Sequence, residues 1–434
     1  MLHLNHQYLG SHVRNCPGWT IIGGGIHGVL LARHLLDTQV ATPETLRILD
    51  PNPRLLHNWK RMTARIGMTH LRSPMVHHLD GDPFSLRNFV NRFKNCDVAM
   101  QQNDVKPFIE PNNRPSLALF NAHCDEIVHE YDLQSLHEQT SVCKVAHRQE
   151  NADWWVHHTH GTLTADNVVL AMGRAPALKP NWAEHAELHG VMVDHVLGEY
   201  TNTDHFQSGS TLLVTGGGLT AGQTALMLID RGFKVIMASR HSIRSEAYDS
   251  DPGWMGPKYL NRFWRSSYGV RRSMIRKARN RGTVTPEIFL QLRAAQTIGK
   301  LSIVRASVSA MDVVTPELMI VRFSDGSQQV IGGILLATGL ETTRPGGNLV
   351  DDLIRELTLP LGRCGFPTPG ATLEWAPGLY VSGALAELEL GPTAPNISGA
   401  RMAAERIVLH ERQKAMRLKQ ECDPSGQVRT AYAV

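Results

Sequence analysis

Residues 19–36 read WTIIGGGIHGVLLARHLL, and this stretch decides the fold. An apolar strand enters a glycine-rich turn, and a segment whose apolar residues have helical spacing follows. Gly23, Gly25 and Gly28 fit the pattern G-x-G-x-x-G. The first glycine permits a tight turn, the second lets a pyrophosphate approach the backbone, and the third lets the helix pack close to the strand. Because the helix N-terminus offers unpaired N–H groups to phosphates, the stretch predicts a dinucleotide site.

The next strand supports this interpretation. Residues 46–49 read LRIL and are followed by Asp50. An acid at the end of this strand is placed to accept hydrogen bonds from ribose hydroxyls. The alternative is a tight strand-to-helix turn that binds no nucleotide. Since both strands, the helix and the acid occur in register, we favour the dinucleotide site.

A second glycine pattern lies in the middle of the chain. Residues 211–223 read TLLVTGGGLTAGQ, in which Gly216, Gly218 and Ala221 fit G-x-G-x-x-A. The order is again an apolar strand, a glycine turn and a helical segment. The sequence therefore predicts two dinucleotide sites, and with them an α/β fold of two Rossmann-like, doubly wound domains.

The two sites differ in the residue that follows their second strand. The strand predicted at 233–238 is followed by Ser239 and Arg240, where the first site has an acid. An arginine at this position suits a ribose 2′-phosphate, so the second site is predicted to bind NADPH. The alternative for Arg240 is a solvent-facing charge.

Bulk properties exclude several classes of protein. A chain of 434 residues is long enough for two or three domains, and its net charge of +4 gives no reason to expect nucleic acid as a partner. No apolar run approaches the roughly 20 residues that span a bilayer. The N-terminus has neither the basic nor the apolar region of a secretory signal. We therefore expect a cytoplasmic protein that does not enter a membrane.

Cysteine and histidine spacing argue against redox-active dithiols and metal sites. No two cysteines are spaced C-x-x-C, which argues against a redox dithiol and a zinc ribbon. Among the 22 histidines, His77-His78 and His157-His158-x-His160 could ligate a metal, but no cysteine or carboxylate pattern completes either set. We predict no metal site and free thiols at all six cysteines: Cys16, Cys96, Cys124, Cys143, Cys364 and Cys422.

The segment 241–300 is distinctive. A loop with bulky groups, 249–257, precedes a run of basic residues. The basic run could face a phosphate or an acidic substrate, but we favour a solvated helix face. Its members are Arg271, Arg272, Arg276, Lys277, Arg279 and Arg281.

Two further features complete the pattern. Buried strands end in A-x-G at residues 171–173 and again at 337–339. Near the C-terminus a strand reads LYVSG at 379–383, and a loop at 391–396 leads into a long helix. Together with the two glycine patterns, about 190 residues apart, these features resemble flavoproteins with two dinucleotide-binding domains. Disulfide reductases of that superfamily carry a dithiol, which this sequence lacks.

Within the superfamily, the chain looks most like the class B flavin monooxygenases of the lysine and ornithine N-hydroxylase type. The stretches HNW at 57–59, MTHLRSP at 68–74 and DPFSL at 82–86 are similar to the family's segment beside the flavin. LATG at 336–339 is similar to its hinge between domains. The second glycine pattern and Leu340 depart from the family's usual residues, and we match none of its amino-acid-binding residues onto 241–300.

The resemblance implies that the NADPH domain is inserted into the FAD domain. The FAD domain would span 15–195 and 330–413, the NADPH domain 196–329, and a polar tail 414–434. It also implies roles for the residues that match. His70 and Arg72 would be polar contacts beside the isoalloxazine, and the remaining cofactor-binding residues would be Gly23, Gly25, Gly28, Asp50, Trp59, Gly216, Gly218, Ala221, Arg240, Thr338, Gly339, Gly383 and Asn396.

The implied function is that of an FAD-dependent, NADPH-using monooxygenase. It would hydroxylate a small nucleophilic substrate, with an amine nitrogen favoured, through a C4a-hydroperoxyflavin formed with O₂. One alternative is an NADPH-dependent flavin reductase or oxidase that passes electrons to a small acceptor. A second is a nucleotide-bound sensor without turnover. The sequence identifies neither the substrate nor the oligomeric state.

Overall fold

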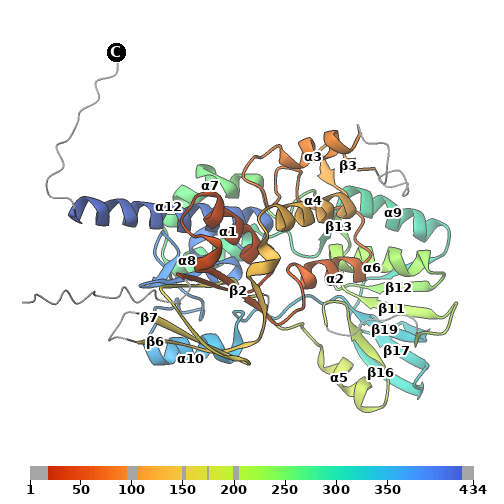
Figure 1. Ribbon diagram of the computed structural model, residues 1–434. Helices are drawn as coiled ribbons and strands as arrows, with labels where there is room; N and C mark the ends of the chain where they lie inside the picture. Colours follow the sequence, from red (N-terminus) through yellow and green to blue (C-terminus); the bar gives the residue numbers. More distant parts are fainter. Residues whose placement is uncertain (1–17, 95–105, 149–152, 174, 199–204, 423–434) are drawn as a thin grey trace, which may run out of the picture.

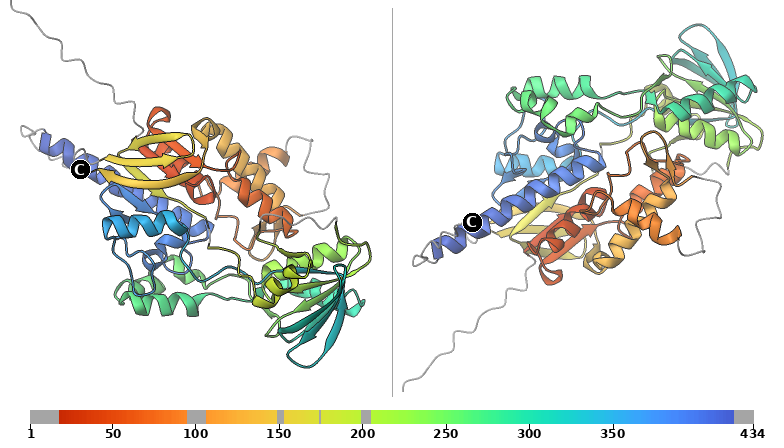
Figure 2. Two further views of the ribbon diagram at one scale, coloured as in Figure 1. Left: turned by 90° about the horizontal axis from the view of Figure 1, so that it is seen from below. Right: turned by 90° about the horizontal axis from the view of Figure 1, so that it is seen from above.

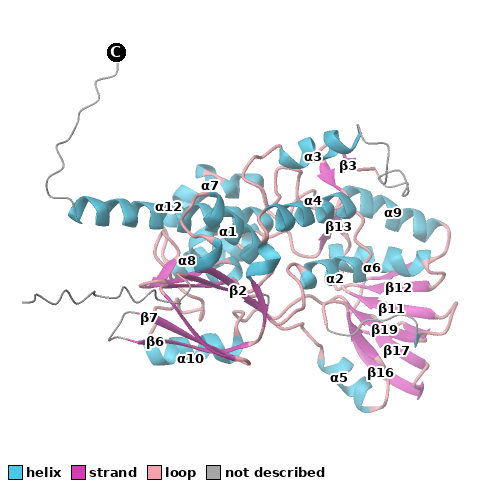
Figure 3. Ribbon diagram, viewed as in Figure 1, coloured by secondary structure: helices cyan, strands magenta, loops and turns pink. Residues whose placement is uncertain are grey.

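The computed structural model describes residues 18–94, 106–148, 153–173, 175–198 and 205–422 (Figure 1). The predicted N-terminal extension, which includes Cys16, lies outside the described residues, as does Cys96. Most of the described strands fall into two groups, each accompanied by helices, while a few short strands lie apart from both (Figure 3). The predicted α/β class with parallel sheets is confirmed.

The first sheet has six strands, in the order β20-β21-β9-β1-β2-β5. Its strands are parallel except β20, which pairs with β21 in antiparallel fashion. The central strands β1, β9 and β21 are buried along their whole length, as expected for a parallel sheet covered on both faces. The strands are β1 (Trp19–Ile22), β2 (Leu46–Asp50), β5 (His137–Gln139), β9 (Asn167–Leu170), β20 (Glu374–Ala376) and β21 (Leu379–Val381).

Two helices from opposite ends of the chain pack together beside this sheet. They are α1 (Ile26–Asp37), which follows the first glycine turn, and α12 (Ile397–Cys422). The predicted polar tail, 414–434, begins within α12, which is exposed at residues 412–417 and continues through Cys422. Residues 423–434 lie outside the described part of the chain.

The second sheet has five parallel strands, in the order β10-β19-β11-β12-β15. Two of them correct the predicted domain boundaries. β10 and β19 were expected in the FAD domain, yet both pair within the second sheet, because the chain enters this sheet by residue 193 and leaves it only after residue 336. The strands are β10 (Val193–His195), β11 (Thr211–Thr215), β12 (Lys234–Ala238), β15 (Leu301–Val304) and β19 (Gly333–Leu336).

Smaller elements surround both sheets. Antiparallel sheets are formed by β6-β7-β8 and by β16-β17-β18, and short pairs by β3-β4 and, in parallel, β13-β14. The strands are β3 (Phe108–Ile109), β4 (Arg114–Pro115), β6 (Val142–Arg148), β7 (Asp153–His158), β8 (Gly161–Ala165), β13 (Arg244–Ser245), β14 (Thr283–Val284), β16 (Val308–Thr315), β17 (Leu318–Phe323) and β18 (Gln328–Ile331). The helices are α2 (His57–Arg65), α3 (Ser85–Lys94), α4 (Leu117–Glu130), α5 (Asn181–Leu188), α6 (Leu219–Asp230), α9 (Pro286–Thr297), α10 (Gly347–Leu357) and α11 (Glu387–Leu390).

One helix pair follows the second-sheet strand β12 in the chain but packs beside elements that accompany the first sheet. α7 (Pro257–Trp264) and α8 (Tyr268–Ala278) lie beside the C-terminal elements and away from β11 and β12 (Figure 2). They are held there by an apolar cluster formed by Trp254, Leu260, Phe263, Ile275, Phe366 and Leu388. This excursion brings the loop before α7 next to elements of the first sheet. None of the helices in the described ranges combines the length and apolarity needed to cross a bilayer.

Candidate functional site

The first glycine turn is built around a carbonyl of a neighbouring strand. Gly23 has a φ of +118°, and a Cβ there would lie 2.4 Å from the carbonyl oxygen of Ala171. A Cβ on Gly28 would lie 1.9 Å from the carbonyl oxygen of Gly23. By contrast, no atom lies within 4 Å of a Cβ built on Gly25. Two glycines therefore permit close packing, and the third leaves open space at the N-terminus of α1.

Asp50 ends β2 and fixes this turn. Its Oδ2 atom accepts the backbone N–H of Gly24 at 2.8 Å. Its Oδ1 atom accepts the backbone N–H of Asn52 at 2.9 Å and the amide Nδ2 of Asn52 at 2.7 Å. Since a carboxylate offers about four acceptor positions, capacity for a further donor such as a ribose hydroxyl remains.

The second glycine turn repeats the first. Gly216 has a φ of +143°, and a Cβ there would lie 2.4 Å from the carbonyl oxygen of Ala337. The atom nearest a Cβ on Gly218 would be the Cα of Gly282, at 3.6 Å, so this turn is also open at its middle glycine. Ala221 is buried in the following helix, α6. The A-x-G strand ends thus supply, in Ala171 and Ala337, the carbonyls that require glycine at the two turns.

Arg240 lies beyond the end of β12 with an exposed side chain. The residue before it, Ser239, approaches the same turn, because a Cβ on Gly217 would lie 2.2 Å from its Oγ atom. Arg240 is therefore at the carboxyl edge of the sheet, beside the open glycine turn.

Thr338 and Gly339 lie where two chain segments cross between the sheets. The hydroxyl of Thr338 donates to the carbonyl of Leu178 and lies 3.2 Å from Nε2 of His195. The backbone N–H of Leu178 donates to the carbonyl of Gly339 at 3.0 Å, and Ala177 forms an isolated bridge with Leu340. These contacts tie the two crossing segments together.

Trp59 and His70 each form a side-chain hydrogen bond to the segment 106–130. The indole Nε1 of Trp59 donates to Oδ1 of Asn121 at 2.9 Å. Nε2 of His70 lies 2.8 Å from the carbonyl oxygen of Lys106. Burial lowers the pKa of His70, so its imidazole is neutral near pH 7.

Arg72 binds the loop 246–249, which lies more than 170 residues further along the chain. One nitrogen, Nη2, donates to the carbonyls of Glu246 at 2.9 Å and Tyr248 at 2.7 Å, and to the hydroxyl of Thr283 at 2.9 Å. Burial lowers the pKa of Arg72, whose guanidinium nevertheless stays charged, as arginine does in proteins. The guanidinium is thus a positioning group for the loop 246–249, a role that the sequence did not indicate.

The loop held by Arg72 forms one wall of a cavity of about 390 Å³. Its aromatic walls include Trp254 and Tyr259, whose ring centroids are 5.2 Å apart. The hydroxyl of Tyr259 donates to Oδ2 of Asp251 at 3.2 Å. Aromatic faces and carboxylates together suit a small organic cation. The lining residues are Glu246, Ala247, Tyr248, Ser250, Asp251, Pro252, Trp254, Tyr259, Ala278 and Asn280.

This cavity adjoins the loop that leads into α12. A Cβ on Gly391 would lie 3.6 Å from Cε3 of Trp254, an atom of the cavity wall. At the other end of the loop, the carbonyl of Asn396 accepts the N–H of Ala400 at 3.0 Å, which makes Asn396 the residue that caps α12. The loop 391–396 therefore lies against Trp254, while residues of the loop held by Arg72 line the cavity itself.

Gly383 meets the first glycine turn through His27. A Cβ on Gly383, whose φ is +66°, would lie 3.7 Å from the His27 ring, and Nδ1 of His27 lies 2.9 Å from Oγ of Ser382. The structure thus brings together the glycine turn and the strand end at 379–383. The sequence analysis missed His27, because the G-x-G-x-x-G pattern allows any residue at that position.

The sequence favoured a solvated helix face for the basic run, but only part of the run is exposed in the structure. Arg271 donates to Oε2 of Glu389 at 2.7 Å, and Arg279 donates to Oε2 of Glu387 at 2.9 Å. Arg272 pairs with the other oxygen of Glu387. Both glutamates are buried, so these arginines face acids of α11, and only Arg276, Lys277 and Arg281 are exposed.

Comparisons with known proteins agree with this fold. Residues 20–175 match a family model described as FAD-NAD(P)-binding. Among curated protein sequences, none matches the chain. Solved structures with the same fold include the FAD-bound cadaverine monooxygenase of Erwinia amylovora, with 15% identity, a TM-score of 0.70, and coverage of 91% of this chain and 94% of that one.

Two ornithine hydroxylases are similarly related. The enzyme of Pseudomonas aeruginosa is 16% identical, with a TM-score of 0.68 and coverage of 92% of this chain and all of that one. An ornithine N-hydroxylase of Kutzneria, solved with reduced FAD, NADP⁺ and L-ornithine, has the same identity, TM-score and coverage. The predicted resemblance to lysine and ornithine N-hydroxylases is thus confirmed for the fold.

Proposed function

We propose that this protein is an FAD-dependent, NADPH-using monooxygenase that hydroxylates a nitrogen of a small amine. The observation that carries the proposal is the cavity lined by aromatic and acidic residues, one wall of which is the loop held by Arg72. The fold supports it, because the cadaverine and ornithine hydroxylases named above share it. The alternatives, a flavin reductase or oxidase and a sensor without turnover, predict different outcomes in the experiment below.

We assign FAD to the first sheet and NADPH to the second. The open space at Gly25, beside the N-terminus of α1, is where the FAD pyrophosphate would approach, and Asp50 retains acceptor capacity for its ribose. Gly218 leaves the corresponding space for NADPH, and exposed Arg240 is placed to bind a 2′-phosphate. When bound, FAD supplies the redox and oxygen chemistry, while the chain supplies position and a water-poor pocket.

Asp251 is the residue that we expect to hold the substrate's cationic end. One of its oxygens accepts the N–H of Gly253 at 2.7 Å, and the other accepts the hydroxyl of Tyr259, so the carboxylate is fixed at the cavity wall. Trp254 offers an aromatic face to a cation or to a methylene chain, whereas Nζ of Lys258 already lies 4.8 Å from the centroid of the Tyr259 ring. The same ammonium lies 3.9 Å from Oδ1 of Asp251, so a substrate amine would replace Lys258 as the partner of this carboxylate.

The test combines isotopic labelling with matched variants. FAD-loaded protein is mixed with NADPH, labelled O₂ and a panel of diamines and amino acids, and products and peroxide are measured. We expect label in an N-hydroxylated product, a fall in peroxide release with the right amine, and a raised KM in Asp251→Asn. Asp312→Asn, a change at an exposed ion pair on β16, is the control and leaves KM unchanged.

Each alternative has its own signature in the same experiment. Peroxide in stoichiometric yield with every amine would identify an oxidase or reductase. A flavin that stays oxidised under NADPH would identify a sensor. If Asp251→Asn hydroxylates an amine as well as the unaltered protein does, the protein is a monooxygenase but this cavity is not its substrate site.

A further inference from the structure

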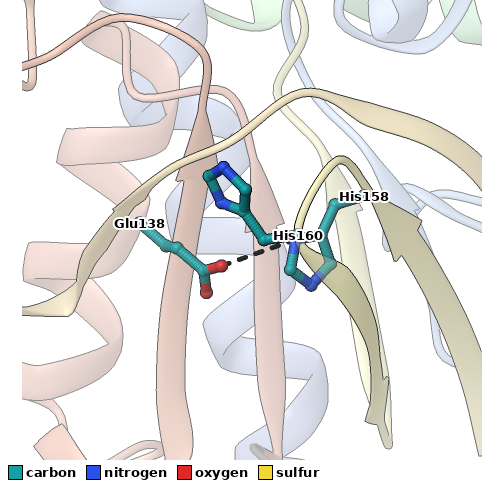
Figure 4. Close-up of side chains that lie close together, drawn as sticks. All are labelled: Glu138, His158 and His160. Atoms are coloured by element: carbon teal, nitrogen blue, oxygen red, sulfur yellow. Dashed lines mark ion pairs between the residues drawn. The ribbon is translucent and has the colours of Figure 1, made fainter.

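Three potential metal ligands meet at the edge of the first sheet, far along the chain from the glycine turns. Glu138 lies on β5, which is the edge strand of that sheet. His158 is the last residue of β7, and His160 lies in the turn that leads to β8. Figure 4 shows the three side chains close together between these elements. The sequence offered the two histidines, but the carboxylate comes from 20 residues earlier in the chain.

The geometry is close to that of a ligand set. Oε1 of Glu138 lies 3.4 Å from Nδ1 of His158, and one ligand atom from each of the three residues lies within 4.8 Å of the others. The His158 side chain is only 7% exposed, whereas His160 is exposed. The potential ligands are therefore a buried His158, a half-buried Glu138 and an exposed His160, whose side chain can rotate.

Neighbouring hydroxyls hold the buried histidine in place. Oγ1 of Thr140 lies 3.0 Å from Nδ1 of His158 and 2.9 Å from Oγ1 of Thr159. Because Thr140 has this second partner, it keeps a hydrogen bond when His158 turns its lone pair to a metal. The backbone N–H of Thr140 donates to the carbonyl of Asp50 at 3.0 Å, which anchors the segment to β2.

We propose that Glu138, His158 and His160 bind a divalent cation of the zinc class, with water as the fourth ligand. Two imidazoles and a carboxylate are a donor set that Zn²⁺ accepts in tetrahedral geometry. Tetrahedral zinc ligands are about 3.3 Å apart, given bonds of about 2.0–2.1 Å, so the set needs to contract, and rotation of exposed His160 provides the movement.

The bound ion joins the β7–β8 turn to the sheet edge. Glu138 belongs to the six-stranded sheet, while His158 ends β7 of the antiparallel sheet β6-β7-β8 and His160 lies in the turn between β7 and β8. A metal that binds only the folded arrangement stabilises that arrangement. This proposal does not depend on the proposed oxygenase activity, because none of the three residues lines the cavity near Arg72.

The test is zinc binding by the full chain, loaded with FAD, freed of metal with a chelator and carrying no histidine tag. Calorimetric titration with Zn²⁺ and elemental analysis after dialysis give affinity and stoichiometry. We expect one equivalent to bind, and the melting temperature to rise with Zn²⁺. His160→Ala and Glu138→Gln should weaken binding by about tenfold or more, as loss of ligands does.

His157→Ala is the matched control. His157 is adjacent on β7, points to the opposite face of the strand and bonds to the hydroxyl of Thr162 at 2.8 Å. The His157→Ala variant should bind zinc with the same affinity as the unaltered protein. Absence of a saturable site in the unaltered protein overturns the proposal, because Glu138 and His158 are then only a hydrogen-bonded pair. Unchanged affinity in both His160→Ala and Glu138→Gln overturns it as well.

Discussion

The Oε2 atom of Glu387 accepts a hydrogen bond from Nη2 of Arg279 at 2.9 Å, across 108 residues of sequence. The same guanidinium donates through Nε to the carbonyl of Pro392 at 3.2 Å. Arg279 follows the end of α8, and Pro392 belongs to the loop that leads into α12. This contact therefore fixes the helix excursion from the second sheet against a loop of the first, next to the candidate cavity.

Replacing Glu387 by Gln should destabilise the protein. Its side chain is 3% exposed and pairs with both Arg272 and Arg279, so the variant leaves two guanidinium groups without a countercharge. Removing one partner of a buried pair costs about 3–5 kcal/mol, which urea unfolding followed by fluorescence can measure. Asp312→Asn breaks an exposed pair with Arg322 and should change the free energy of unfolding by less than about 1 kcal/mol. Equal effects of the two changes would contradict this account.

Gly25→Val should abolish FAD binding while leaving the protein folded. Gly25 has φ −82° and ψ −169°, which valine adopts readily, and no atom lies within 4 Å of its Cβ position. The new side chain would occupy only the proposed pyrophosphate path. Gly28→Val should instead disrupt folding, since its Cβ would lie 1.9 Å from the carbonyl oxygen of Gly23. FAD release on denaturation and circular dichroism separate the two outcomes; a Gly25→Val protein that retains FAD would contradict the assignment.

Arg240→Ala should weaken the use of NADPH and barely affect NADH. A guanidinium bound to a phosphate contributes roughly 1.5–3 kcal/mol, which corresponds to a rise of about one to two decades in the KM for NADPH. Lys234→Ala, at the opposite end of β12, is the control and should leave both KM values unchanged. Equal losses for NADPH and NADH in Arg240→Ala would show that Arg240 does not bind the 2′-phosphate.

Stability should fall as the pH is lowered from about 6.5 toward 4. Burial lowers the pKa of His123 to about 4, with His78 contributing, and burial also lowers that of His77 to about 4. Because the unfolded chain binds these protons near pH 6.5 and the folded protein only near pH 4, unfolding gains protons in this window. Each histidine contributes a slope of about 1.4 kcal/mol per pH unit there, and nothing above it.

The variant that tests this is His123→Gln, which can keep a hydrogen bond to Ser85, now 2.9 Å from Nε2 of His123. Urea unfolding at several pH values should show a shallower loss of stability between pH 6.5 and 4 than in the unaltered protein. His157→Ala, a surface change, should keep the original slope. Identical slopes in all three proteins would contradict burial of a neutral His123.

The sequence by itself determined the two βα units and the fold class. A glycine turn, the strand before it and the helix after it lie within about 20 residues, and their pattern follows from local backbone geometry. The residues also predicted the long terminal helix, and the order of all these elements led to the resemblance. The boundaries between the sheets were wrong at β10 and β19, because a short apolar strand carries no mark of the sheet in which it pairs.

Only the tertiary structure decided which distant side chains meet. The sequence suggested a contact with the flavin for Arg72 and a solvated face for the basic run, yet Arg72 binds a loop, and Arg271 and Arg279 bind two buried acids, all more than 100 residues away. Glu138 joined His158 and His160 only because β5 lies on the sheet edge beside the β7–β8 turn. Local periodicity shows which face of an element is apolar, but a charged side chain's partner depends on how the elements pack, and that packing is set by apolar burial across the whole chain.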